Sequence, residues 1–281
     1  MKFLIKKTKK LIKKIQGKDK KKYVSVLNLN GVIGKDSKLE SGINFQNLEP
    51  LIKKAFEQDN LEAIALCVNS PGGSPVQSEL IYNYLRELSI SKKIPIYSFA
   101  QDISASGGYW LLSAGDEIYA HNSSIIGSIG VIFSSFGFVD LIKKIGIDRR
   151  VYTEGKNKAI LDPFLPEQQE NITILKAVQK DIYENFVNLV KERRINKINF
   201  DNEELFSGAF WSGKKALELG LIDGIADFRS KMQEKFGKNV EFIKISSKKS
   251  FLKNLFSEKT NLVEKFFCNL EEKIFFNKFG L

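Results

Sequence analysis

Two periods of apolar and polar residues run along the middle of the chain, and they predict strands alternating with helices. Residues 23–34, YVSVLNLNGVIG, alternate and end at a glycine, which is typical of a strand. Residues 61–70, LEAIALCVNS, form a short apolar run that predicts a buried strand. The same criteria predict strands at residues 94–100, 116–123, 128–135 and 149–155.

Apolar residues at helical spacing separate these strands. We expect helices at residues 47–58, 75–90, 106–113, 138–147 and 166–194. Ser74 is placed to cap the second of them, with Pro75 at its first position. Strands that alternate with helices in this way predict an α/β fold with a parallel sheet built from βαβ units.

The charge is concentrated at one end of the chain. The net charge is +11, but residues 1–22 contain eleven lysines and one aspartate, so the remaining residues are close to neutral. Leu4, Leu11 and Ile15 recur in this arm at helical spacing. We therefore expect a basic amphipathic arm that binds an anionic membrane surface, with a solvated tail as the alternative, and no nucleic-acid partner.

We expect neither a membrane span nor a secretory signal in the arm. Its longest apolar run is three residues, whereas a span needs about 20. At the other end, residues 246–281 contain apolar stripes at helical spacing, which predict amphipathic helices. We expect these helices to pack on the domain or on a neighbouring subunit, with membrane contact as the alternative. Residues 23–245 then form the main domain.

Composition excludes some site chemistries. The chain has two cysteines and one histidine, so a Cys/His zinc site is nearly excluded, and no CxxC pattern occurs. Cys67 lies in the apolar run AIALCV, which predicts a small buried side chain.

Ser106 is a candidate nucleophile in DISASGGYW, residues 102–110. It follows a predicted strand, opens a predicted helix and precedes two glycines, which let a ligand approach the backbone. The pattern is close to the nucleophile elbow G-x-S-x-G but lacks its first glycine. Because serine is also common as a helix cap, this stretch alone does not separate the two roles.

A second glycine pair, in VNSPGGS at residues 68–74, separates a buried strand from a helix. Such a turn can direct backbone N–H groups at an anion, and it suits an oxyanion hole better than a phosphate site. The base that would activate Ser106 is then either His121, the single histidine, or a lysine whose pKa is lowered by burial. Composition does not choose among the lysines.

Five ordered motifs resolve this choice by resemblance: VNSPGGSPVQSELI, ASGGYW, GSIGVI, VYTEGKNKAILDPF and FWSGKKALELGLIDGIAD. Together, over about residues 23–230, they resemble the signal peptide peptidase A family of serine peptidases in its short form with one catalytic domain. That family has a ClpP/crotonase-like α/β fold of repeated ββα units. The resemblance implies a serine endopeptidase that cleaves signal-peptide remnants or other apolar peptides at the membrane.

The resemblance also implies roles for individual residues. Ser106 is the expected nucleophile and Lys158, in GKNKA, the expected general base, in preference to the nearby Lys156. Ser128, in GSIGV, matches the serine that holds the lysine amine. Gly73 and Gly107 match the backbone donors of the oxyanion hole. No metal or other cofactor is implied, and His121 is expected to be a non-catalytic surface residue.

Family likeness further implies a homo-oligomeric ring in which neighbouring subunits help to build each active site. Family members often begin with a transmembrane anchor, whereas this chain begins with the basic arm, so we expect a peripheral enzyme on the cytoplasmic side of a membrane. Two alternatives remain: an acyl-thioester-processing enzyme of the crotonase superfamily, and a non-enzymatic membrane-associated scaffold.

Overall fold

The computed structural model describes residues 21–34, 42–246 and 276–280. Most of the predicted basic arm and of the predicted C-terminal helices therefore lies outside the described residues. The limits of the expected main domain, 23–245, stay a prediction for the same reason.

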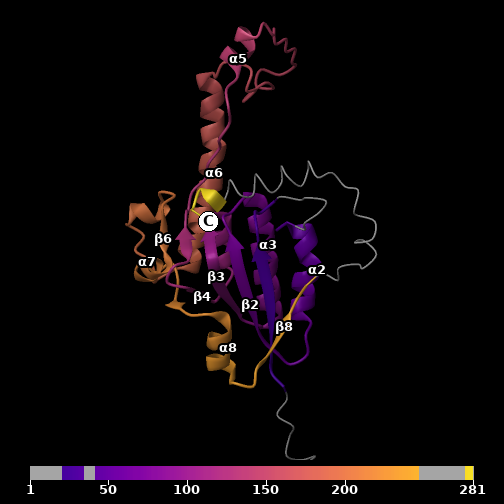
Figure 1. The fold of residues 1–281 in the computed structure, drawn as a ribbon, viewed down its shortest axis with the longest axis vertical. Helices are drawn as coiled ribbons and strands as arrows, with labels where there is room; N and C mark the ends of the chain where they lie inside the picture. The colour runs from indigo at the N-terminus through magenta and orange to yellow at the C-terminus, as the bar shows by residue number, and fades with distance from the viewer. Residues whose placement is uncertain (1–20, 35–41, 247–275, 281) are drawn as a thin grey trace, which may run out of the picture.

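Within the described residues, one twisted sheet of eight strands forms the centre of the protein (Figure 1). Its main path has the order β6-β5-β3-β2-β1-β8, and β4 pairs with β3 and β7 to one side of this path. Neighbouring strands are parallel except for β5 and β6, which are antiparallel. The strands are β1 (Tyr23–Asn30), β2 (Leu61–Ser70), β3 (Ile96–Ala105), β4 (Glu117–Ala120), β5 (Ile125–Gly127), β6 (Phe210–Ser212), β7 (Gly224–Ile225) and β8 (Glu241–Lys244).

Helices cover both faces of the sheet, which explains why β2 is apolar on both faces from Ala63 to Val68. Ile64, Leu66 and Val68 of β2 belong to the larger core, together with the buried faces of α2 (Phe45–Phe56), α3 (Pro75–Lys92), α4 (Gly107–Leu112) and α6 (Gln169–Arg193). The alternate residues Ala63, Ala65 and Cys67 face a smaller core that includes Met232 of α8 (Phe228–Phe236). A strand buried on both faces is expected in a parallel α/β sheet, so the predicted fold class is confirmed.

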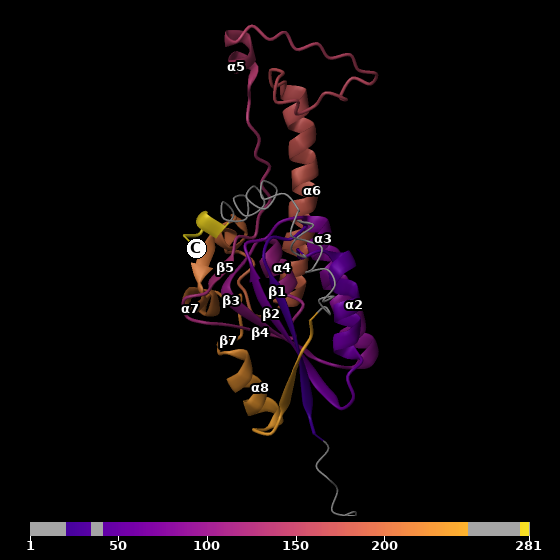
Figure 2. The same ribbon diagram turned by 45° about the vertical axis from the view of Figure 1, so that its right-hand side comes forward.

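The remaining elements are short. They are α5 (Val139–Lys144), a 3₁₀ turn at Glu203–Phe206, and α7 (Gly213–Glu218). The elements after residue 194 were not individually predicted from the sequence. Residues 128–168, with α5 among them, form a projecting arm, which is distinct from the basic arm of residues 1–22. This projecting arm extends with the first turns of α6 away from the sheet (Figures 1 and 2).

Two predicted strands are wrong, and the arm explains both. Residues 128–135 leave the sheet at Ser128, where φ is +53° and the extended pairing of β5 ends. Residues 149–155 lie on the arm, are mostly exposed and pair with no strand that the structure describes. Alternating apolar residues form a strand only where a neighbouring strand accepts the backbone hydrogen bonds.

Candidate active site

Ser106 lies on a strained turn between β3 and α4. Its φ of +54° and ψ of −123° are unusual for a residue with a Cβ. Its backbone C=O accepts hydrogen bonds from the N–H groups of Tyr109 at 2.9 Å and Trp110 at 3.0 Å. The side chain makes no capping hydrogen bond. Ser106 therefore occupies the cap position through its backbone alone, and its hydroxyl is available for another purpose.

The glycine turn after β2 packs directly against this elbow. A Cβ on Gly72 would lie 2.8 Å from the Ser106 Cβ, and a Cβ on Gly107 would lie 3.4 Å from the Gly73 nitrogen. The turn is fastened to Ile33, whose N–H donates to the Gly72 carbonyl at 2.8 Å and whose carbonyl accepts from the Ser74 N–H at 2.9 Å. Only residues without a side chain allow two backbone segments to approach this closely.

The N–H groups of Gly73 and Gly107 have no hydrogen-bond acceptor within the described part of the chain. The Gly107 N–H is one of the unpaired donors at the start of α4. The two groups lie on adjoining backbone segments beside Ser106. Such a pair of unpaired donors next to a serine hydroxyl is the arrangement that stabilises an oxyanion.

Ser128 lies next to Ser106 because β3 and β5 end together. Ala105 pairs with Gly127, and the Ser106 N–H donates to the Gly127 carbonyl at 2.8 Å. The two serines are thus the first residues after neighbouring parallel strands. Both have a positive φ, +54° and +53°. The Ser128 N–H donates to the Ala209 carbonyl at 2.7 Å, which anchors this end of the site.

These residues open into a cavity of about 880 Å³. Ser106, Ser128 and Gly73 contribute to its wall, and apolar residues form much of the rest, namely Val32, Ile33, Val131, Ile132, Phe133 and Phe206. Tyr183 also lines the cavity and donates its hydroxyl to the Phe206 carbonyl at 2.7 Å. Burial raises the pKa of Tyr183, so this phenol stays neutral. An apolar wall beside a free hydroxyl suits an apolar peptide better than a charged ligand.

The chain contributes residues near its C-terminus to the same cavity, which the sequence reasoning missed. Lys278 and Phe279 line it, and the Phe279 ring packs edge-on against Phe210 of β6 with 5.1 Å between ring centroids. The apolar spacing of the tail predicted helical packing but carried no sign of which surface the tail meets.

Lys158 is not brought to Ser106 within this chain. It belongs to the segment between α5 and α6, which lies beyond the outer end of α6, and it is not among the residues that line the Ser106 cavity (Figures 1 and 2). Lys158 is exposed, and its backbone N–H donates to the Gly155 carbonyl at 3.0 Å. Lys156, its neighbour in the motif, forms an ion pair with Glu170 at 2.7 Å.

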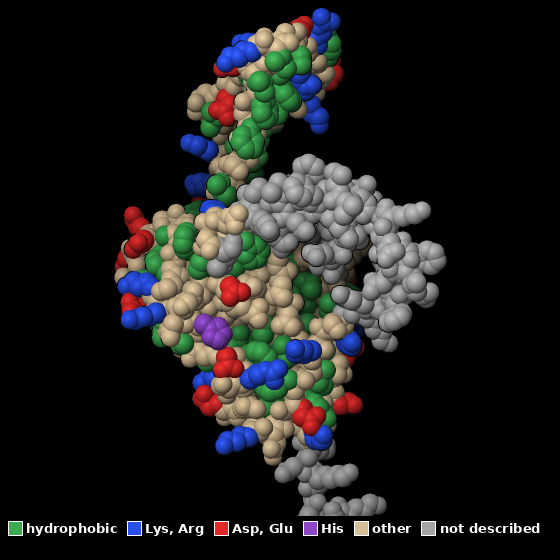
Figure 3. Space-filling view, in the orientation of Figure 1, with side chains coloured by type: hydrophobic (Ala, Val, Ile, Leu, Met, Phe, Trp, Pro, Cys, Tyr) green, Lys and Arg blue, Asp and Glu red, His purple; other side chains and the backbone are tan. Residues whose placement is uncertain are grey.

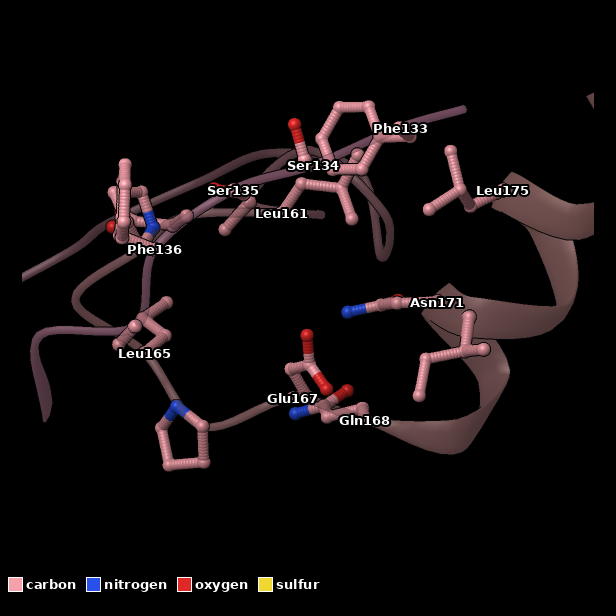
Figure 4. Close-up of a pocket in the computed structure, with 16 residues that line it drawn as sticks. Phe133, Ser134, Ser135, Phe136, Leu161, Leu165, Glu167, Gln168, Asn171 and Leu175 are labelled. Atoms are coloured by element: carbon pink, nitrogen blue, oxygen red, sulfur yellow. The ribbon is translucent and has the colours of Figure 1, made fainter. Parts of the chain in front are cut away.

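The Lys158 segment nevertheless has a defined support within the arm. Its neighbour Ala159 lines a second cavity of about 390 Å³, where Phe136, Leu161, Leu165 and Leu175 surround the open space (Figure 4). The Phe138 N–H donates to the Pro163 carbonyl at 2.7 Å, and Arg149 pairs with Asp162 at 2.7 Å. The hydrogen bond from Arg149 lowers the pKa of Asp162. The arm therefore holds the Lys158 loop through contacts on both sides.

Two further groups are placed away from nucleophilic chemistry. His121 is exposed at the end of β4 and does not line the Ser106 cavity (Figure 3). Cys67 is 1% exposed, and burial raises the pKa of its thiol to about 12, so the prediction of a small buried side chain is confirmed. Within the described ranges, no three His, Cys, Asp or Glu side chains gather closely enough to hold a metal ion.

A strained serine between a parallel strand and a helix, beside two glycine N–H groups that have no acceptor among the described residues, defines the class: an α/β protein with the geometry of a serine hydrolase. A family model described as "Peptidase family S49" matches residues 89–261, more than half of the chain. The chain therefore belongs to peptidase family S49, the signal peptide peptidase A family, and its fold is of the ClpP-like type.

The names of two relatives agree with this family, and a third relative carries a different name. The chain is 36% identical over 220 residues to "Putative signal peptide peptidase SppA" of Enterococcus faecium, covering 75% of this chain and 61% of that protein. It is 28% identical over 228 residues to "Serine protease SPPA, chloroplastic" of Arabidopsis thaliana, covering 77% and 33%. It is 46% identical over 230 residues to a Brucella abortus protein named "Na(+)/H(+) antiporter NhaA", covering 82% and 31%.

The chain spans about a third of the Brucella and Arabidopsis proteins and about three fifths of the Enterococcus protein. The name of each relative describes the whole of that longer protein. Across residues 21–34, 42–246 and 276–280, we find no helix with the length and apolarity that crossing a bilayer requires.

Proposed function

We propose that this chain is a serine endopeptidase in which Ser106 is the nucleophile and Lys158 is the general base, and that it cleaves signal-peptide remnants or other apolar peptides at a membrane. The observation that carries the proposal is the Ser106 elbow. Its hydroxyl is not used for capping, and it adjoins two N–H groups that have no acceptor in the part of the chain that the structure describes, in a largely apolar cavity. The names of the Enterococcus and Arabidopsis relatives support the same reaction class.

The chemistry follows from these groups. A neutral lysine amine takes the proton of Ser106 as its oxygen attacks a peptide carbonyl. The Gly73 and Gly107 N–H groups stabilise the negative oxygen of the tetrahedral intermediate. The lysine then protonates the leaving amine, and water hydrolyses the acyl-enzyme. Ser128, one strand away from Ser106, is the proposed partner that orients the lysine amine.

The position of Lys158 on the projecting arm leads us to propose that the lysine reaches the Ser106 of a neighbouring copy in a homo-oligomeric ring. The arm has exposed apolar side chains, among them Phe136 at 79% and Tyr152 at 90% (Figure 3). A group of exposed apolar side chains on one projecting segment is typical of a contact surface. Head-to-tail contacts between identical chains close into rings when the rotation allows.

Single substitutions test the nucleophile and the base. Ser106→Ala and Lys158→Ala each remove hydrolysis of an apolar peptide substrate, whereas His121→Ala retains it. A fluorophosphonate probe labels the wild type at Ser106. Turnover of an acyl-CoA in place of the peptide supports the acyl-thioester alternative, and a folded wild type that neither turns over nor reacts with the probe supports the scaffold.

Mixing the two inactive variants tests the shared site. If each site takes Ser106 from one copy and Lys158 from the next, an equal mixture reassembled into mixed rings recovers up to about a quarter of the wild-type activity. If both residues come from one chain, every site in the mixture keeps one defect and no activity returns. Ser106→Ala mixed with wild type at the same ratio is the control for activity lost during reassembly, because half of its sites keep both residues whether or not subunits exchange.

A further inference from the structure

Strand β3 carries a bulge four residues before the nucleophile. Val68 pairs with Ala100 and Ser70 pairs with Ser104, so the single residue Asn69 lies opposite three residues of β3, Gln101, Asp102 and Ile103. At the same place β3 exchanges its other neighbour, from β4 at residues 97–99 to β5 at residues 103–105. A bulge of this kind interrupts the backbone ladder and leaves polar groups that need other partners.

Side chains on both sides of β3 supply these partners. The Asn69 Oδ1 accepts from the Ile103 N–H at 3.1 Å, and its Nδ2 donates to the Asp102 Oδ2 at 3.0 Å. On the opposite side, the buried Ser124 Oγ donates to the Gln101 carbonyl at 2.5 Å and accepts from the His121 N–H at 3.0 Å. The bulge is therefore fastened through Asn69 to β2 and through Ser124 to the turn before β5.

The contacts downstream of the bulge leave no room for a shift between β2 and β3. A Cβ on Gly108 would lie 2.4 Å from the Ser70 carbonyl oxygen, and one on Gly72 would lie 2.8 Å from the Ser106 Cβ. The glycine turn follows β2 and the elbow follows β3. A change in the number of β3 residues accommodated at the bulge would therefore move Ser106 relative to the Gly73 N–H.

We propose that Asn69 and Ser124 are positioning residues that hold the β3 bulge, and through it align Ser106 with the donors of Gly73 and Gly107. This inference rests on the proposed function, because it assigns a catalytic consequence to the alignment. Neither side chain lines the Ser106 cavity, so both act through the backbone of β3. A displacement of about 1 Å at a reacting group can cost about 100-fold in rate.

Asn69→Asp tests the alignment with little change in shape. The aspartate keeps an acceptor for the Ile103 N–H but places a carboxylate against that of Asp102. We expect kcat to fall about 10- to 100-fold with KM nearly unchanged. A peptide aldehyde, whose adduct puts an oxygen between the two donors, loses affinity by a similar factor. Adding Asp102→Asn restores a carboxylate–amide hydrogen bond in the reverse sense, and kcat returns to within about threefold of wild type.

Asn28→Asp is the matched control, because Asn28 is exposed on the neighbouring strand β1 and should leave kcat unchanged. If Asn69→Asp does not fold, Ser124→Ala removes only a hydroxyl and carries the same expectation for kcat and KM. Wild-type kcat in a folded Asn69→Asp variant, a rise in KM alone, or a folded double variant without recovery would each overturn the inference. A wild type without peptidase activity would instead refute the proposed function.

Discussion

Replacing Gly73 by alanine should remove activity through a clash that can be measured in the structure. The new Cβ would lie 2.1 Å from the Ile33 carbonyl oxygen, whereas real Cβ contacts essentially never fall below 3.0 Å. The turn must therefore move by about 0.9 Å. The oxygen that the Cβ meets is a backbone atom, and the Ile33 carbonyl is held by the Ser74 N–H at 2.9 Å, so neither segment yields easily.

This displacement carries the Gly73 N–H away from the oxyanion. A 1 Å misplacement costs about 100-fold, and loss of one such donor costs about 100- to 1,000-fold. We therefore expect kcat to fall at least about 100-fold, equivalent to about 2.7 kcal/mol in transition-state stabilisation. The assay is steady-state hydrolysis of an apolar peptide, with fluorophosphonate labelling of Ser106 as a second readout.

Gly237→Ala separates the clash from backbone strain. Gly237 has a φ of +97° with nothing within 4 Å of the site of a Cβ, and it ends α8 away from the cavity. It bears the strain of a positive φ, about 1–3 kcal/mol, without a clash. We expect lower stability and unchanged kcat. Folded Gly73→Ala with wild-type kcat would refute the assignment of this turn to the oxyanion hole.

Two further predictions concern stability and membrane contact. Burial raises the pKa of Asp223, but hydrogen bonds from Arg194 and Lys197 outweigh it and hold the pKa below its usual value. Such a group stabilises the fold above its unfolded pKa of about 3.9 and loses this effect as pH falls through the lower folded value. Asp223→Asn should thus lower the free energy of unfolding by about 3 kcal/mol at pH 7, because Arg194 is 1% exposed and loses its carboxylate partner. In urea unfolding, the difference in this free energy between wild type and variant should narrow near pH 3. An equal difference at both pH values contradicts this. Deleting residues 1–22 should weaken binding to anionic vesicles by about 1 kcal/mol for each basic residue that contacts the surface, and should leave binding to neutral vesicles unchanged. Unchanged binding to anionic vesicles would exclude the proposed membrane role of the basic arm.

The local features of the site could be predicted from sequence. Ser106 at a strand-to-helix junction and the glycines at 72 and 73 are visible because strand, turn and helix signals are read within ten residues. The apolar run of β2 likewise indicates burial on both faces. The strands predicted at 128–135 and 149–155 were wrong because alternation records which residues are apolar, and not whether a partner strand is present.

The sequence by itself determined the α/β class, the glycine-flanked serine and the ordered motifs that mark the family. Tertiary structure alone decided the bulge braced by Asn69 and Ser124, the approach of Phe279 to the cavity, and the place of Lys158 on an arm away from its own Ser106. The physical reason is range. Periodicity reports the surroundings of neighbouring residues, whereas strand register and contacts between distant segments depend on packing that no local pattern encodes.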